Sequence, residues 1–109
     1  MVEVIFRKDS RLRLSSVSAR GHTEWSASGT DIICAAVSAI LQAARLGVEQ
    51  VAAVPLSVTQ HEGTIELRWD ESARDDPAVC AIVRTAELSL AQIADQYPEH
   101  VLVRSEPQT

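Results

Sequence analysis

The chain has 109 residues, of which 46% are hydrophobic and 23% are charged, and its net charge is −5 at pH 7. This length fits one domain with its own hydrophobic core, and the composition is ordinary for a soluble protein. The negative charge argues against a protein that binds nucleic acid over a broad surface.

Further classes of protein are disfavoured by patterns within the sequence. No apolar run is long enough to cross a bilayer, and residues 1–10 alternate like a strand and lack the apolar segment of a secretion signal. The two cysteines, Cys34 and Cys80, make no disulfide framework. We therefore expect a cytoplasmic protein with no membrane partner.

Charge is distributed unevenly along the chain. Residues 1–30 carry more basic than acidic side chains, and the acidic excess lies in the C-terminal half. An acidic surface would steer a basic partner towards the protein, whereas a solvated helix face is the simpler explanation.

The first half of the chain predicts a hairpin, a loop and a helix. Residues 2–8 (VEVIFRK) and 12–19 (LRLSSVSA) alternate between apolar and polar side chains on either side of a polar turn, which is typical of a β-hairpin. Residues 20–30 contain two glycines and few apolar groups and are expected to form a loop. Over residues 31–49 the apolar side chains recur at three- and four-residue steps, which predicts a helix that stops near Gly47.

The second half is expected to have a similar layout, a hairpin followed by a helix, with one further strand at its end. Residues 54–60 and 64–69 flank the turn His61–Gly63 and predict a second hairpin. Pro77 suits the first turn of a second helix, which carries an apolar stripe, and residues 100–105 close as a strand. The expected class is α+β in the order strand-strand-helix-strand-strand-helix-strand, with two helices packed on antiparallel strands. We expect a single domain over residues 1–104 and a loose tail over 105–109, while periodicity leaves open whether the strands form one sheet or two.

Cys34 is a candidate nucleophile because of its place near the start of the first helix. If Thr30 or Asp31 caps that helix, Cys34 falls in the first turn, where unpaired backbone N–H groups and the helix dipole favour an anion. Such a position lowers the pKa of a thiol, and the same N–H groups, including that of Cys34, could stabilise an oxyanion. His22, at the end of the second strand, is the candidate general base.

Structural roles explain the same residues equally well at this stage. Cysteine is often buried as a small apolar residue, and His22 could simply bond to the backbone of its loop. Asp31 is first of all a helix cap, worth about 1 kcal/mol. Ser38, one turn after Cys34, could support the site or bond back to a helix carbonyl.

Metal and phosphate sites are not expected. The histidines and cysteines His22, Cys34, His61, Cys80 and His100 form none of the close pairs that zinc sites use. The segment GTDIICAAVS lacks the lysine and second glycine of a phosphate-binding loop. We expect Cys80 to lie in or near the core, and His61 and His100 to be structural or solvated.

Several motifs together resemble one family. Gly21–His22, the run from Gly29 to Ser38 and the twelve-residue step from His22 to Cys34 are similar to the signature of the ribosomal-processing cysteine protease (Prp, YsxB-like) family. HEGTIELRW resembles the central hairpin of that family, and LSLAQIADQYPEHVLV resembles its closing helix and strand. The resemblance spans almost the whole chain.

The resemblance implies a specific activity. Members of the family are small homodimeric cysteine proteases that remove an N-terminal extension from a large-subunit ribosomal protein, without a cofactor. Carried onto this sequence, Cys34 is the nucleophile and His22 its base, and Asp31 and Ser38 support the site. The substrate loop would include Gly21, Trp25, Ser28 and Gly29.

This sequence also departs from the family in the substrate loop. Ser28 stands where relatives often have an aromatic residue, and Thr23 stands where a small alanine is usual. Trp25 could replace the aromatic group, although it is also explained as a loop anchor. These changes concern the preferred cleavage sequence rather than the Cys34 and His22 chemistry.

Two other hypotheses follow from the same residues. One is a non-catalytic ribosome-associated binding module on the same fold. The other is a redox or acyl-transfer enzyme that uses an activated Cys34, although no second cysteine lies nearby in the first helix to resolve an oxidised form.

Overall fold

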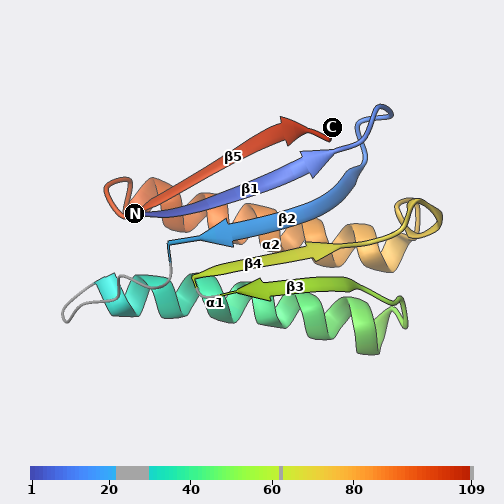
Figure 1. Ribbon diagram of the computed structural model, residues 1–109, viewed down its shortest axis with the longest axis horizontal. Coiled ribbons are helices and arrows are strands. Elements are labelled where there is room, and N and C mark those ends of the chain that lie inside the picture. The colour runs from blue at the N-terminus through green and yellow to red at the C-terminus, as the bar shows by residue number, and fades with distance from the viewer. Residues whose placement is uncertain (22–29, 62, 109) are drawn as a thin grey trace.

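The computed structural model describes residues 1–21, 30–61 and 63–108, and within this part it leaves the side chains of Thr30 and Asp31 undescribed. A β-sheet forms one layer and two long helices form the other, behind the sheet in Figure 1. The expected α+β class and the expected order of the elements are confirmed. The elements are β1 (Val2–Lys8), β2 (Leu14–Arg20), α1 (Thr30–Leu46), a π-helical turn (Gly47–Val51), β3 (Ser57–His61), β4 (Thr64–Arg68), a short 3-10 helix (Glu71–Ala73), α2 (Pro77–Gln96) and β5 (Val101–Pro107).

All five strands belong to a single sheet with the order β3-β4-β2-β1-β5, which answers the question of one sheet or two. The expectation of purely antiparallel strands is wrong for β5, which pairs with β1 in parallel. The reason is the crossover through α2, which carries the chain back along the sheet before β5 begins. The remaining pairs, β1 with β2, β2 with β4 and β3 with β4, are antiparallel.

The expected loose tail over residues 105–109 is also wrong for most of its length. β5 continues to Pro107, and its register with β1 runs from Val2 paired with Val101 to Lys8 paired with Pro107. The backbone N–H of Gln108 then donates to the carbonyl of Lys8 at 2.7 Å. Backbone hydrogen bonds order this segment, and they form largely independently of the polarity of its side chains.

α1 ends at Leu46, directly before Gly47, as the sequence predicts, and the chain continues as the π-helical turn to Val51. A Cβ atom at Gly47 would lie 3.1 Å from Cγ2 of Ile82 in α2. The glycine therefore allows α1 and α2 to approach each other closely.

The second helix begins as the sequence predicts. Asp76 caps it, with its side chain accepting hydrogen bonds from the N–H groups of Ala78 at 2.8 Å and Val79 at 3.2 Å, and Pro77 occupies the first turn. Cys80 is exposed, so its expected core position is wrong. It follows the fully buried Val79, and one residue turns a helix by about 100°, which carries the next side chain away from the core.

The core lies between the two layers. Alternate residues of the strands and one stripe of each helix contribute to it, and Trp69 is its largest buried side chain. The indole N–H of Trp69 donates to the carbonyl of Leu14 at 2.9 Å, so this polar group remains satisfied inside the core.

Two helical segments, Ile32–Val51 and Pro77–Gln96, are long and apolar enough to span a membrane by length and composition. This differs from our expectation that no apolar run reaches that length. Both segments pack one stripe of side chains on the sheet, with Val37 and Leu41 in the first and Val79 and Leu90 in the second fully or almost fully buried. This one-sided burial is typical of helices that cover a sheet.

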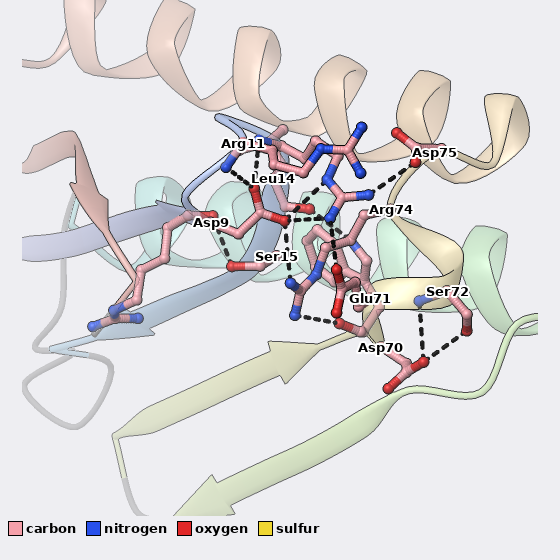
Figure 2. Close-up of polar contacts among 12 residues, drawn as sticks. Asp9, Arg11, Leu14, Ser15, Asp70, Glu71, Ser72, Arg74 and Asp75 are labelled. Atoms are coloured by element: carbon pink, nitrogen blue, oxygen red, sulfur yellow. Dashed lines mark hydrogen bonds and ion pairs between the residues drawn. The ribbon is translucent and has the colours of Figure 1, made fainter.

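A polar network secures the end of the sheet where β1 turns into β2 (Figure 2). The carboxylate of Asp9 accepts hydrogen bonds from the backbone N–H groups of Arg11 at 2.9 Å and Arg13 at 3.0 Å. It also accepts from the guanidinium groups of Arg13 at 3.0 Å and Arg74 at 3.2 Å. Burial alone would raise the pKa of Asp9, but these hydrogen bonds outweigh it and lower the pKa to about 2.

Replacement of Asp9 by asparagine is expected to lower the stability of the fold at neutral pH. The ordinary pKa is 3.8, so the ionised carboxylate stabilises the folded state fully above about pH 4, and this stabilisation is lost as the pH falls through about 2. Urea unfolding at pH 7 and pH 3 should show a lower midpoint for Asp9→Asn and a weaker dependence on pH. Asp95→Asn, at an exposed position of α2, serves as the control. Equal midpoints for both variants at pH 7 would contradict this role of Asp9.

Candidate active site

The candidate site lies at the end of the molecule where β2 finishes, α1 starts and the turn between β3 and β4 passes (Figure 1). At this end the backbone N–H of Gly21 donates to the carbonyl of Gly63 at 3.0 Å. The hydrogen bond joins the residue directly before His22 to the hairpin turn. The chain therefore leaves β2 towards His22 from a fixed point of the sheet.

Gly21 is required at this point for two reasons. Its φ is +106°, a backbone conformation that other residues rarely adopt. A Cβ atom there would also lie 2.5 Å from the carbonyl oxygen of Met1. The expected place of Gly21 in the substrate loop thus has a structural explanation, independent of any contact with a substrate.

Cys34 lies one or two helical positions deeper than the sequence predicts. Thr30 is already helical, so Cys34 is the fifth residue of α1 rather than part of its first turn. In a regular helix only the N–H groups of the first turn lack a partner within the helix, and the N–H of the fifth residue bonds to a carbonyl one turn back. The backbone N–H of Cys34 is therefore part of the helix, and it is not one of the donors that the first turn offers to an anion.

The side chain of Cys34 is 1% exposed and belongs to the core cluster, together with neighbours such as Ile33 and Val37. Cys80, in contrast, is exposed on α2. Burial shields this thiol from solvent. A peptide can therefore reach the sulfur only when the groups that cover it move.

Ser38 follows Cys34 by one turn and is half-buried at the wall of a polar pocket of about 270 Å³. Gln42 of α1 and Gln60 of β3 lie in the same wall, and the hairpin turn closes one end. Neither glutamine is among the site residues predicted from the sequence. For Gln42 there was a signal, the four-residue spacing of Cys34, Ser38 and Gln42, which places all three along one side of the helix.

Other predicted site residues fall outside the described part of the chain. These are His22, Trp25, Ser28 and Gly29, and the side chain of Asp31 is likewise not described, although its backbone belongs to α1. The pairing of Cys34 with His22 and the supporting role of Asp31 therefore stay predictions.

Charged side chains link the strands at the site end of the sheet. Glu3 of β1 accepts a hydrogen bond from Nε of Arg20 in β2 at 2.8 Å and forms an ion pair with Arg104 of β5 at 3.4 Å. The hydrogen bond from Arg20, reinforced by the charge of Arg104, lowers the pKa of Glu3. Glu3 is therefore a charged partner for two arginines rather than a candidate proton donor at neutral pH.

Metal ligation finds no support among the described residues. In that part of the chain no three His, Cys, Asp or Glu side chains are arranged so that together they could hold a metal ion. His61 lies at the end of β3 and is exposed, and His100 precedes β5.

Comparison with known proteins identifies the family. A family model described as cysteine protease Prp matches residues 1–102, nearly the entire chain. The chain belongs to the Prp family. The family resemblance and the enzyme class inferred from the sequence, a cysteine protease, are thereby confirmed.

Crystal structures share the fold over almost the full length. A protein from Streptococcus mutans is 25% identical with a TM-score of 0.86, and the match covers 99% of this chain and 96% of that one. The essential ribosomal processing protease Prp from S. aureus, in complex with a substrate peptide, is 20% identical with a TM-score of 0.87, covering 97% and 100% of the two chains. Among curated proteins no sequence matches significantly.

Replacement of Gly21 by alanine is expected to destabilise the protein by about 1–3 kcal/mol, the usual cost of a residue held in a disfavoured conformation. The clash with Met1 adds to this cost. Gly47→Ala is the matched comparison and should cost less, because its φ is not positive and the nearest group is a side chain, Ile82, rather than backbone. Thermal unfolding of both variants measures the difference, and a Gly21→Ala protein as stable as the parent would show that the β2 end is not held as described.

Proposed function

We propose that the protein removes an N-terminal extension from a large-subunit ribosomal protein in the cytoplasm. The observation that carries this proposal is the family match over residues 1–102, which includes Cys34 and the segment with His22. The S. aureus relative is a ribosomal processing protease that was crystallised with a substrate peptide and also with a covalently linked product peptide. A covalent product in that protein agrees with nucleophilic catalysis by a thiol.

The proposed mechanism is acyl transfer through Cys34. His22 takes the thiol proton, and the thiolate attacks the scissile carbonyl to form a tetrahedral oxyanion. Unpaired N–H groups at the start of α1 stabilise the oxyanion. His22 then protonates the leaving amine, the peptide bond breaks, and water hydrolyses the thioester to restore the thiol.

The burial of Cys34 adds one requirement to this mechanism. The sulfur lies in a core cluster with an exposed fraction of only 1% for the residue, so attack needs a movement that opens a path to it. We propose that substrate binding provides this opening.

The same burial favours a second candidate function, a ribosome-associated binding module without proteolytic activity. Buried cysteines are common as small apolar residues, and a permanently covered thiol would have no chemical role. In this case the protein binds the precursor of the ribosomal protein and leaves it intact.

The test is incubation of the purified protein with the precursor of that ribosomal protein from the same organism, followed by mass spectrometry of the products. We expect one cut near the N-terminus, and a loss of at least about a thousandfold in rate for Cys34→Ala and for His22→Ala. Cys80→Ser is the control with an exposed thiol removed, and its rate should match that of the parent.

The outcome separates the two candidates. Cleavage by the parent that persists in Cys34→Ala would refute the proposed nucleophile. Binding of the precursor without any cleavage would favour the binding module.

A homodimer is also part of the proposal, and the outer surface of the two helices supports it. Small and apolar side chains of α1 and α2 line a groove of about 410 Å³ between the helices, among them Ile40, Ala43 and Ile82. Only 33% and 22% of the apolar windows in the two helices are buried within the chain. We propose that a second copy covers this face, because apolar surface of this extent generally marks an interface.

Ala43→Arg is expected to weaken the dimer by placing a charge in the groove, with a shift from dimer to monomer at micromolar concentration. Thr59→Arg introduces the same charge on an exposed residue of β3 and should leave the dimer intact. Analytical ultracentrifugation measures both, and an unchanged dimer in Ala43→Arg would place the interface elsewhere.

A further inference from the structure

The polar pocket next to Ser38 has a composition that suits recognition of a side chain. Gln42 and Ser38 of α1 lie on one wall, and Gln60 and Thr64 of the β3–β4 hairpin lie on another. These four side chains all carry neutral hydrogen-bonding groups. None of the four makes a hydrogen bond to another described residue, so their donors and acceptors remain available to a ligand.

The sheet register orients Gln60 towards the pocket. Gln60 pairs with Ile65, and paired residues of neighbouring strands point to the same face of a sheet. Ile65 is buried beneath the helices and also lines the pocket. His61 pairs with Thr64 instead, one residue further along, and lies at the rim of the pocket.

The pocket lies at a defined distance from the proposed nucleophile. Cys34, Ser38 and Gln42 succeed one another at steps of four residues along α1. At 1.5 Å per residue, Gln42 is about 12 Å along the helix axis from Cys34. An extended peptide rises about 3.3 Å per residue and spans this distance in about three or four residues.

The pocket is also open to an extended chain. β3 is an edge strand of the sheet, with β4 as its only neighbour among the described strands. In Figure 1 the start of α1 lies towards the same end of the molecule as the end of β3, so a peptide that runs along α1 from its first turns approaches the pocket. Proteins commonly bind extended peptides beside such edges and select their alternate side chains by pockets.

We propose that this pocket is a specificity site for the substrate, and that Gln42 and Gln60 bind an uncharged polar side chain three or four residues from the scissile bond. Amide groups donate and accept at once, so they complement amide and hydroxyl side chains of the substrate. An aliphatic side chain would leave the amides without partners, and the four neutral side chains offer a charged group no opposite charge. The inference rests on the proposed protease function and adds the class of side chain that the site selects.

The test uses synthetic peptides that span the cut found in the ribosomal-protein precursor. In each peptide one position, three or four residues before or after the scissile bond, carries Gln, Leu or Glu. At one of these positions the parent is expected to prefer Gln over Leu by about tenfold in kcat/KM, in line with one or two net hydrogen bonds. The double variant Gln42→Ala, Gln60→Ala should reduce this preference to about twofold or less, through a loss of activity on the Gln peptide.

A control variant and a second readout separate specificity from general damage. Gln50→Ala removes an exposed glutamine outside the pocket and should retain the tenfold preference. The double variant should lose activity on the Gln peptide and cut the Leu peptide no more slowly than the parent, because the amides that Leu leaves without partners are gone. Slower cleavage of both peptides would indicate general damage instead.

Each outcome bears on a distinct claim. A parent that cuts the peptides without any preference at these positions, or a double variant that keeps the preference, would overturn the specificity site while leaving the protease function in place. A parent that cuts neither the precursor nor any peptide would overturn both.

Discussion

The hydrogen bond from Gly21 to Gly63 is the contact on which the candidate active site depends. It joins the end of β2 to the turn between β3 and β4, and the close approach of Gly21 to Met1 brings β1 to the same point. Strand order alone would align β2 and β4 but would leave the exit of the chain towards His22 undetermined. Because only glycine fits the backbone there, this small residue decides where the loop to α1 begins.

The two ends of the sheet have separate tasks. At the end opposite the site, Asp9 joins the β1–β2 turn to Arg74, which follows the short 3-10 helix, through hydrogen bonds that hold the turn closed. At the site end, Glu3 of β1 joins Arg20 of β2 and Arg104 of β5, and the backbone bond of Gly21 joins the end of β2 to the hairpin turn. The Asp9 network thus fixes a turn, whereas the contacts at the site end fix the strands from which the chain leaves towards His22.

One helix links core packing to the proposed chemistry. α1 buries Cys34, Val37 and Leu41 against the sheet, and the same helix presents Ser38 and Gln42 to the polar pocket. A substrate that binds at the pocket would thus contact a rigid element whose next turn holds the thiol. Rigid support of this kind fixes the geometry between a binding group and a reacting group better than a loop does.

Periodicity in the sequence was sufficient to predict both helices, all five strands and the order of these elements along the chain, because each buried face leaves a regular apolar pattern. The family motif was sufficient to identify a cysteine protease. Other features depend on contacts between distant segments and were decided only by the tertiary structure. The parallel pairing of β5 with β1, which orders residues up to Pro107, arises from backbone hydrogen bonds that side chains do not encode. Gly47 directly follows the last residue of α1, as the sequence predicts, but the close approach of Ile82 to it is visible only in the tertiary structure. The pocket of Gln42 and Gln60 likewise exists only because segments far apart in the sequence, α1 and the β3–β4 hairpin, lie beside each other.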